Sequence, residues 1–300
     1  MTDQTWVIET DDLSKRYGRV TAVERLSLAV PRGQITAFLG RNGAGKSTTI
    51  KMLLGIVRPT AGKGMVLGRH IENARDSREL RRNVAYVAEN KGLYRYFTVD
   101  EMIRFTRSFY RDWRPETEQR LLENYELPRS RKVKALSKGM RTKLSLLLAL
   151  ARRPELLILD EPSEGLDPVS IEEFLQALVA AASEGVTIFF SSHQIAEVER
   201  IADRVCIIDR GRLAIEFSMD QLRQHFRRVT AAFSKVPSER LFDIPGVASV
   251  MAQGRQITMV ANRDASALVE RAHSLQAISV EVAPVSLREV FLETVRNDHS

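Results

Sequence analysis

Cysteine is almost absent from this sequence, since Cys206 is the only one among 300 residues. A single cysteine excludes an internal disulfide, and the sequence has no cluster of cysteines and histidines with the spacing of metal ligands. Cys206 stands in the apolar run at 205–208, which predicts a strand. We therefore expect a buried thiol there, because free cysteine behaves as a small hydrophobic residue.

Long hydrophobic runs are also missing. The longest apolar stretch without a charge lies around residues 144–151, far below the ~20 residues that a membrane-spanning helix needs. Residues 1–5 have neither the basic segment nor the apolar segment of a secretory signal. We therefore expect a function at a membrane to require a partner protein that spans it.

Basic residues outnumber acidic ones, 45 against 38, which gives a net charge of +7 at pH 7. Such an excess is compatible with a nucleic-acid surface or with a face opposed to anionic lipid headgroups. The basic residues are spread along the chain, with short clusters at 78–82 and 129–132 and no long basic run. A scattered, solvated distribution is the interpretation we favour.

The order of apolar runs predicts an α/β fold over residues 1–222. The runs at 156–159, 186–190 and 205–208 are almost continuously apolar, which is typical of parallel strands covered on both faces. A helical pattern at about 90–150 predicts a helical subdomain inserted between such strands.

After residue 222 the pattern changes, and a chain of this length has room for a second domain. A strand at 229–233, a hairpin around 253–255 and a helical segment at 265–275 indicate βαββαβ order. We predict a small α+β domain at 223–300, and it carries no motif that we can link to chemistry.

Residues 40–48 have the pattern G-x-x-x-x-G-K-[ST]. An apolar run precedes this segment and a helical pattern follows it, which is the strand–loop–helix context that the motif requires. Backbone N–H groups of such a loop surround phosphate oxygens, and the helix N-terminus adds partial positive charge. We expect Lys46 to reach the β- and γ-phosphates of a nucleoside triphosphate and Ser47 to hold Mg²⁺. The predicted phosphate-binding residues are Gly40, Asn42, Gly43, Ala44, Gly45, Lys46, Ser47 and Thr48.

Polar side chains follow two of the predicted strands. Asp160 and Glu161 end the run at 156–159, where we expect Asp160 to hold Mg²⁺ and Glu161 to polarise an attacking water. His193 closes the next strand along the chain. Because ligands bind at the carboxyl ends of strands in open α/β sheets, a ligand contact is a better interpretation of His193 than a structural role.

Together these segments resemble the ATP-binding subunit of an ABC transporter over about residues 6–220. Residues 40–48 match the Walker A loop of that family, and residues 156–161 match its Walker B strand. Residues 136–140 match the signature motif, and the motifs occur in the family's order.

The resemblance implies roles for five further residues. Ser137 and Gly139 of the signature motif would contact the γ-phosphate of ATP held by a second cassette. Asp167 belongs to the matching D-loop, and His193 matches the switch histidine that senses the γ-phosphate. Tyr17 matches the position at which an aromatic ring stacks on adenine.

Two segments depart from the family pattern, at three positions. The family usually places a glutamine where this chain has Glu89, and we expect this carboxylate to reach the metal and to have a pKa coupled to those of Asp160 and Glu161. The signature motif contains Lys138 and Met140, which puts the contact of its last residue in doubt. Both changes resemble those of the exporter branch with a separately encoded permease.

The family resemblance implies ATP and Mg²⁺ as ligands and a head-to-tail pair of cassettes, here a homodimer. Catalysis would involve Glu161 as base, together with Lys46, His193 and Glu89. A membrane permease would be the second partner, which implies a cytoplasmic protein peripheral to the inner face of the cell membrane. Nucleic acid is not an expected partner.

Two questions stay open from the sequence. The alternative function is that of a soluble ABC ATPase acting on ribosomes or nucleic acid, which the basic balance would tolerate. The aromatic segment at 92–97 could dock a permease helix, or it could be an internal packing cluster.

Overall fold

The computed structural model describes residues 6–89, 92–235, 237–242, 244–262 and 265–297. The prediction that residues 1–5 form no secretory signal lies outside these ranges. The chain divides into two compact units, Met1–Leu213 and Ala214–Ser300. None of the helices in the described residues has the length and apolar content needed to span a bilayer.

The central sheet has six strands in the order β10-β9-β3-β8-β7-β6, and the division between the two units falls within β10. They are β3 (Ile35–Leu39), β6 (Val84–Val87), β7 (Leu156–Asp160), β8 (Thr187–Ser192), β9 (Arg204–Asp209) and β10 (Arg212–Ser218). The five strands from β9 to β6 pair in parallel, and every residue of β3, β7 and β8 is buried. This confirms the predicted parallel sheet and the buried thiol of Cys206 in β9.

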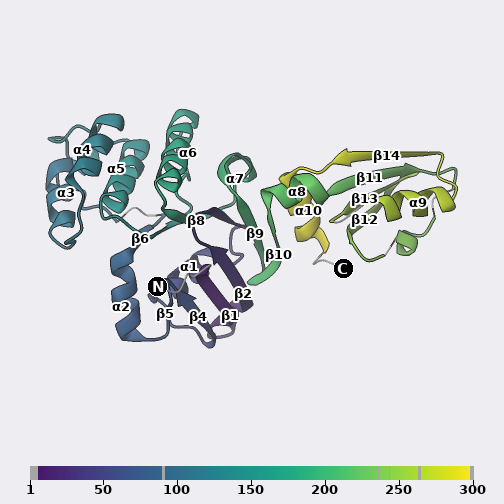
Figure 1. The fold of residues 1–300 in the computed structure, drawn as a ribbon, viewed down its shortest axis with the longest axis horizontal. Coiled ribbons are helices and arrows are strands. Elements are labelled where there is room, and N and C mark those ends of the chain that lie inside the picture. Colours follow the sequence, from purple (N-terminus) through teal and green to yellow (C-terminus); the bar gives the residue numbers. More distant parts are fainter. Residues whose placement is uncertain (1–5, 90–91, 236, 243, 263–264, 298–300) are drawn as a thin grey trace. The chain divides into compact units, whose positions relative to one another are not determined.

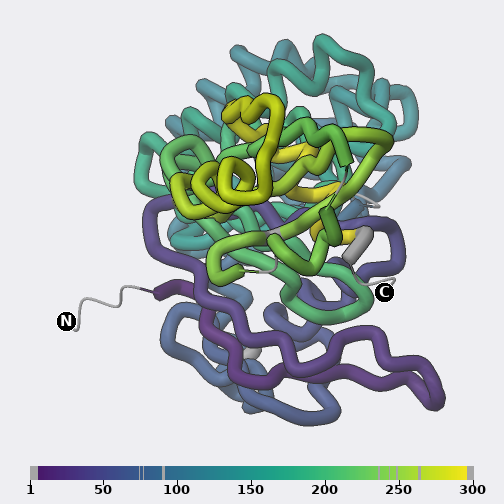
Figure 2. The backbone as a smooth tube through the Cα atoms, turned by 90° about the vertical axis from the view of Figure 1, so that its right-hand side faces the viewer, coloured from purple at the N-terminus to yellow at the C-terminus, as the bar shows by residue number. Residues whose placement is uncertain are grey.

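A second, antiparallel sheet is built around a long hairpin. Its strands are β1 (Trp6–Tyr17), β2 (Val20–Pro31), β4 (Ala61–Val66) and β5 (Arg69–His70), in the order β2-β1-β4-β5. Figure 2 shows β1 and β2 running side by side to the tip of the hairpin, in purple. The sequence pattern predicts two short strands here, at 6–9 and 26–30, because the distal half of the hairpin is mostly solvent-exposed and lacks an apolar run.

Helices cover the central sheet and extend beyond its β6 edge (Figure 1). They are α1 (Lys46–Leu53), α2 (Ala74–Asn83), α3 (Val99–Arg107), α4 (Pro115–Asn124), η1 (Val133–Ala135), α5 (Lys138–Leu150), α6 (Pro168–Ser183) and α7 (Ile195–Ile201). Helices α3, α4 and α5 lie between β6 and β7 in the chain, and these two strands are parallel neighbours. The predicted helical insert is therefore confirmed.

The second unit is an α+β domain with one four-stranded antiparallel sheet in the order β12-β13-β11-β14. Its elements are α8 (Met219–His225), β11 (Arg227–Ala232), η2 (Glu239–Phe242), β12 (Val247–Gln253), β13 (Gln256–Ala261), α9 (Ser266–Ser274), β14 (Ser279–Pro284) and α10 (Leu287–Asn297). The predicted βαββαβ order holds except that its first helix is the short 3₁₀ turn η2. A separate core that includes Phe233, Phe242 and Met259 stabilises this unit.

Candidate nucleotide-binding site

The glycine-rich loop connects the end of β3 to the start of α1. Gly43 and Gly45 have φ angles of +82° and +106°, a region that residues with a side chain rarely adopt. A Cβ atom on Gly45 would also lie only 2.5 Å from the carbonyl oxygen of Ala22. The loop therefore depends on glycine at position 45 both for its backbone conformation and for its close approach to β2.

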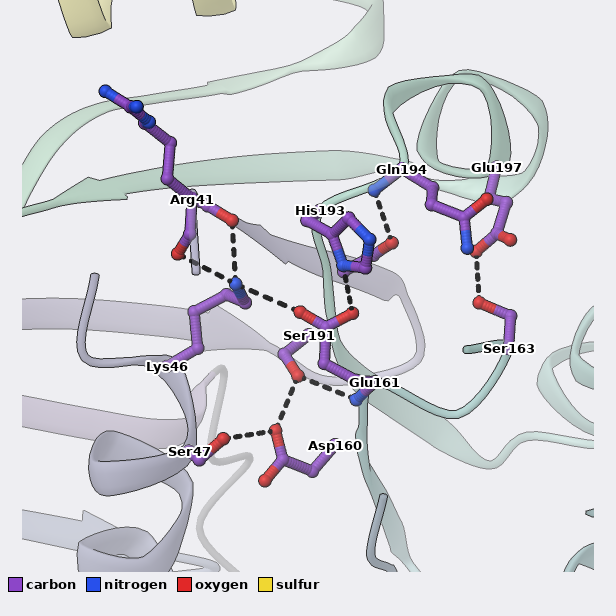
Figure 3. Close-up of polar contacts among 12 residues, drawn as sticks. Arg41, Lys46, Ser47, Asp160, Glu161, Ser163, Ser191, His193, Gln194 and Glu197 are labelled. Carbon is purple, nitrogen blue, oxygen red and sulfur yellow. Dashed lines mark hydrogen bonds and ion pairs between the residues drawn. The ribbon is translucent and has the colours of Figure 1, made fainter. Parts of the chain in front are cut away.

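Lys46 is the first residue of α1, and its side chain is only 5% exposed. Its ammonium donates hydrogen bonds to the carbonyl oxygens of Gly40 at 2.7 Å and Arg41 at 3.1 Å. It also lies 3.0 Å from Oε1 of Glu161 (Figure 3). The loop thus wraps its own backbone carbonyls around a cation that points at the predicted catalytic carboxylate.

Glu161 follows β7 in a strained backbone conformation, with a φ angle of +45°. Its backbone N–H donates to the hydroxyl of Ser191 at 3.0 Å. Its second carboxylate oxygen, Oε2, lies 2.8 Å from Nδ1 of His193. Lys46, Glu161 and His193 therefore form one continuous polar chain, in which Glu161 is the central member (Figure 3).

Asp160 and Ser47 lie side by side below this chain. The Ser47 hydroxyl donates to Oδ1 of Asp160 at 3.0 Å, and the Ser191 hydroxyl donates to the same oxygen at 2.8 Å. Asp160 is only 3% exposed, and in the described part of the chain both of these partners are neutral hydroxyls. A buried carboxylate without a cationic partner beside a loop hydroxyl fits Mg²⁺, which prefers oxygen ligands.

Glu89, the third predicted metal residue, is exposed at the end of β6. Its pKa is raised, first by desolvation and then by the charge of Glu164 and a hydrogen bond with it, with smaller contributions from Asp160 and Glu161. The expected coupling to the last two residues is present, but Glu164 of the D-loop is the stronger partner. Among the described residues, no group of three or more His, Cys, Asp or Glu side chains is arranged to hold a metal ion.

The signature residues and the D-loop form a second cluster, at the N-termini of α5 and α6. Ser137 caps α5 by accepting a hydrogen bond from the backbone of Met140 at 3.1 Å. A Cβ atom on Gly139 would lie 2.4 Å from the hydroxyl oxygen of Ser170. That hydroxyl donates to Asp167, which caps α6 and whose pKa is lowered by this bond and by backbone N–H donors. Asp167 therefore has a clear structural role in its own chain.

The remaining predicted residues are placed as follows. Tyr17 is at the end of β1 and is 48% exposed, and the ammonium of Lys15 lies 5.1 Å from the centre of its ring. Within the loop Asn42 is exposed and Ala44 is buried, while Thr48 lies half-buried in the first turn of α1.

Sequence reasoning missed several polar side chains that support this site. Ser191 bonds both Asp160 and the backbone of Glu161, although only His193 of the same segment was assigned a role. Ser163 donates to the buried carboxylate of Glu197 at 2.6 Å, which ties the D-loop to α7. The run of hydroxyls before His193 was a usable signal, whereas nothing in the sequence relates Ser163 to Glu197.

Comparisons with known proteins agree with this geometry. Residues 23–164 match the family model described as ABC transporter. The bacitracin transport ATP-binding protein BcrA of Bacillus licheniformis is 38% identical over 225 residues, covering 74% of this chain and 73% of its own. A solved structure of an ATP binding subunit of an ABC transporter covers 73% of this chain and 92% of its own, with 32% identity and a TM-score of 0.65.

Another relative extends the similarity through the second unit. An uncharacterized ABC transporter ATP-binding protein of Synechocystis sp. is 31% identical over 98% of this chain and 86% of its own length. These coverages, together with the arrangement of the loop and the acidic strand end, identify the family. The chain belongs to the ATP-binding proteins of ABC transporters.

Proposed function

We propose that this chain hydrolyses ATP and thereby drives an ABC exporter through a separate membrane permease. The observation that carries the proposal is the polar chain from Lys46 through Glu161 to His193, directly above the Ser47–Asp160 pair. Phosphoryl transfer needs little covalent chemistry from a protein, so positioned charges supply most of the catalysis. We assign this chemistry to residues 1–222, with residues 90–150 as the helical subdomain.

The contacts support the role that we propose for each residue. Lys46 and the backbone N–H groups of the loop bind the phosphates, and Glu161 accepts the proton of the attacking water. His193 holds Glu161 in place through the 2.8 Å contact and senses the γ-phosphate. Bound Mg²⁺ supplies charge neutralisation at the phosphate oxygens, and Ser47, Asp160 and Glu89 are the residues we propose to hold it.

A second copy of the chain is part of the proposal. Ser137, Gly139 and Asp167 form their own cluster at two helix N-termini, apart from the contacts that join Lys46 to Glu161. A helix N-terminus that presents backbone N–H groups favours an anion such as a phosphate. We propose that the signature residues of one copy complete the ATP site of the other, with Tyr17 stacking on adenine.

The permease would dock on an aromatic surface of the helical subdomain. This aromatic surface consists of Tyr94, Tyr96, Phe97, Phe105 and Phe109. Tyr94 and Tyr96 are 55% and 78% exposed, and rings within the surface touch at centroid distances of 5.0 to 5.6 Å. Exposed, clustered aromatic rings are typical of protein interfaces, so the surface supports docking over internal packing. The chain would then be cytoplasmic and peripheral to the membrane.

The names of the relatives support export. BcrA is named as a bacitracin transport protein. YbhF of Escherichia coli, which is 35% identical over 72% of this chain and 38% of its own length, is named as a probable multidrug ABC transporter ATP-binding protein. Both names describe proteins whose cargo includes drugs, and we propose a cargo of that class for the complex containing this chain.

The test combines hydrolysis with partner capture. We expect the purified chain to hydrolyse ATP in the presence of Mg²⁺, and Glu161→Gln to lower the turnover at least a hundredfold while ATP binding persists. Tagged Glu161→Gln protein, purified with ATP from gently solubilised cells, should bring down a polytopic membrane protein. Capture of ribosomal proteins or nucleic acid without a membrane protein would overturn the proposal, as would wild-type turnover in the variant.

A further inference from the structure

A polar cavity lies within the first unit, away from the phosphate loop. It has a volume of about 600 Å³ and is lined by α4, α5, α6 and the segments that precede β3, β7 and β8. The phosphate loop follows the carboxyl end of β3, whereas Arg32 and Glu155 line the cavity just before the amino ends of β3 and β7. The cavity and the nucleotide site therefore lie at opposite edges of the central sheet.

The cavity has an excess of positive charge. Its charged lining residues are Arg32, Arg114, Arg120, Lys143, Arg153, Glu155, Glu173 and Glu184. Each carboxylate already has a basic partner: Arg32 contacts Glu155 at 3.2 Å, Lys143 contacts Glu173 at 2.7 Å, and Arg120 makes two bonds to Glu184 at 2.5 and 3.1 Å.

Two guanidinium groups of the cavity do not belong to these ion pairs. Among the described residues, Arg114 and Arg153 have no carboxylate within ion-pair distance, although both line the cavity. Arg114 precedes α4 and Arg153 follows α5, and their backbone N–H groups bond to the carbonyls of Ala151 and Leu150. The backbones of these two residues are thus held close together, and their exposed guanidinium groups are available to an anion at the wall of the cavity.

A tyrosine whose hydroxyl is enclosed also lines this cavity. Tyr125 lines it at the end of α4 and is only 8% exposed. Its hydroxyl has no hydrogen-bond partner in the described part of the chain. Burial raises the pKa of Tyr125 to about 12, so that the hydroxyl keeps its proton and can donate. Buried polar groups are normally bonded, and leaving one unbonded costs stability.

We propose that this cavity binds a small anionic compound through a phosphate or carboxylate group. The guanidinium groups of Arg114 and Arg153 would pair with the anion, and a small movement of the enclosed Tyr125 side chain would let its hydroxyl donate a hydrogen bond to the same anion. Guanidinium groups present planar pairs of N–H donors that match the oxygens of both kinds of anion, and such bonds are stronger than neutral ones. The site does not depend on the proposed function, because no residue of the ATP site takes part.

The test follows Tyr125 directly in the full-length chain. The protein is labelled with 3-fluorotyrosine, and the ¹⁹F resonance of Tyr125 is assigned by its loss in Tyr125→Phe, because the chain has six tyrosines. The phosphate loop is saturated with Mg-ADP, and inorganic phosphate and succinate are titrated separately. We expect a saturable shift of the Tyr125 resonance with at least one of the two probes, and the stronger probe identifies the preferred anion.

Two sets of variants separate specific binding from general charge effects. Arg114→Gln/Arg153→Gln should weaken the apparent affinity about tenfold, as expected for the loss of charge-assisted hydrogen bonds. The control Arg240→Gln/Arg255→Gln removes the same charge from the second unit and should leave the affinity unchanged. Arg153→Lys keeps the charge but loses the planar fork, so it should weaken binding by a smaller factor.

Several results would overturn the inference. A Tyr125 resonance that does not shift with either probe would do so, as would equal weakening by the two double variants. If Arg114→Gln/Arg153→Gln no longer bound Mg-ADP, its fold would be in question, and Arg153→Lys alone would then decide. An affinity equal to that of the wild type in Arg153→Lys would count against pairing with the guanidinium group.

Discussion

The ammonium of Lys46 lies 3.0 Å from the carboxylate of Glu161, and both side chains are almost fully buried, at 5% and 9% exposure. Removing one member of a buried ion pair is destabilising unless another charge takes its place, and in Glu161→Gln the phosphates of bound ATP would pair with Lys46. The other carboxylate oxygen of Glu161 contacts His193, so the position of this carboxylate depends on a residue from each side. A change at Lys46 or His193 should therefore alter the position of the Glu161 carboxylate.

His193→Ala is the first test of this arrangement. His193 is only half-buried, and its ring touches Glu161 through Nδ1 at 2.8 Å. Without that contact Glu161 is held on one side only, and a misplacement of about 1 Å can cost about a hundredfold in rate. We expect kcat for ATP hydrolysis to fall between about tenfold and a hundredfold, with a much smaller change in the KM for ATP.

The matched control is His273→Ala, which removes an exposed histidine of α9 in the second unit. It should leave both kinetic constants unchanged. If His193→Ala instead raised the KM for ATP by tenfold or more and left kcat unchanged, His193 would contribute only to nucleotide binding.

Ser137→Asp separates helix capping from phosphate contact. Ser137 caps α5 through its side-chain oxygen, and aspartate caps helices about as well as serine. The fold and the binding of ATP by a single copy should therefore persist. A carboxylate at position 137 would repel the γ-phosphate of the ATP bound to the second copy. We therefore expect the rate of ATP hydrolysis to fall at least about tenfold.

Ser218→Asp provides the comparison, because Ser218 caps α8 in the second unit with the same geometry. Steady-state hydrolysis and melting temperatures of the two variants would be measured together. Full activity in Ser137→Asp would contradict the role proposed for the signature motif in the partner's site.

The sequence predicts well where strong patterns act over a few residues. The apolar runs at 156–159 and 205–208 lie within β7 and β9, and the glycine-rich loop lies between a strand and a helix as its motif requires. The contact of Ser47 with Asp160 also follows, because parallel strands bring their carboxyl ends to one edge of the sheet. Local pattern and fold class are sufficient for these features.

Other features depend on contacts between distant side chains, for which the sequence has no periodic signal. Helix α2 is so polar that its sequence has no apolar periodicity, and we predict no helix for this segment from the sequence. The hydrogen bond from Ser163 to Glu197 joins two segments of unremarkable composition. The unpaired hydroxyl of Tyr125 is visible only once the helices around it are in place.

Glu197→Gln should change how stability depends on pH. Burial raises the pKa of Glu197, while the hydrogen bond from Ser163 lowers it by less. A carboxyl with a raised pKa binds its proton more tightly in the folded state, so stability falls as pH rises above the ordinary value of 4.5. Glutamine keeps an acceptor for Ser163 and cannot ionise. The melting temperature of the variant minus that of the wild type should therefore increase as the pH rises above 4.5.

Glu199→Gln on the exposed side of the same helix serves as the control, since it removes one charge without removing a buried carboxyl. Its difference from the wild type should vary less with pH. A difference for Glu197→Gln that stays constant across the range would mean that this carboxyl has the same pKa in the folded and unfolded states.

Tyr96→Ala tests the aromatic surface as a docking site. The Tyr96 ring is 78% exposed, and its described contact is with the ammonium of Lys134 at 5.6 Å from the ring centre. Truncating it should leave the melting temperature and the basal hydrolysis of ATP unchanged. Aromatic residues at the centre of interfaces contribute about 2 kcal/mol or more, so capture of the permease should fall at least tenfold.

Ile278→Ala is the matched control for Tyr96→Ala, because Ile278 is 70% exposed but belongs to the second unit. Each change would be combined with Glu161→Gln in a tagged protein. Quantitative mass spectrometry would then compare the material captured by Tyr96→Ala/Glu161→Gln with that captured by Ile278→Ala/Glu161→Gln. Equal capture by both would contradict docking at the aromatic surface, because two comparably exposed hydrophobic side chains would then be equivalent. Loss of capture together with a lower melting temperature would instead indicate that Tyr96 stabilises the helical subdomain.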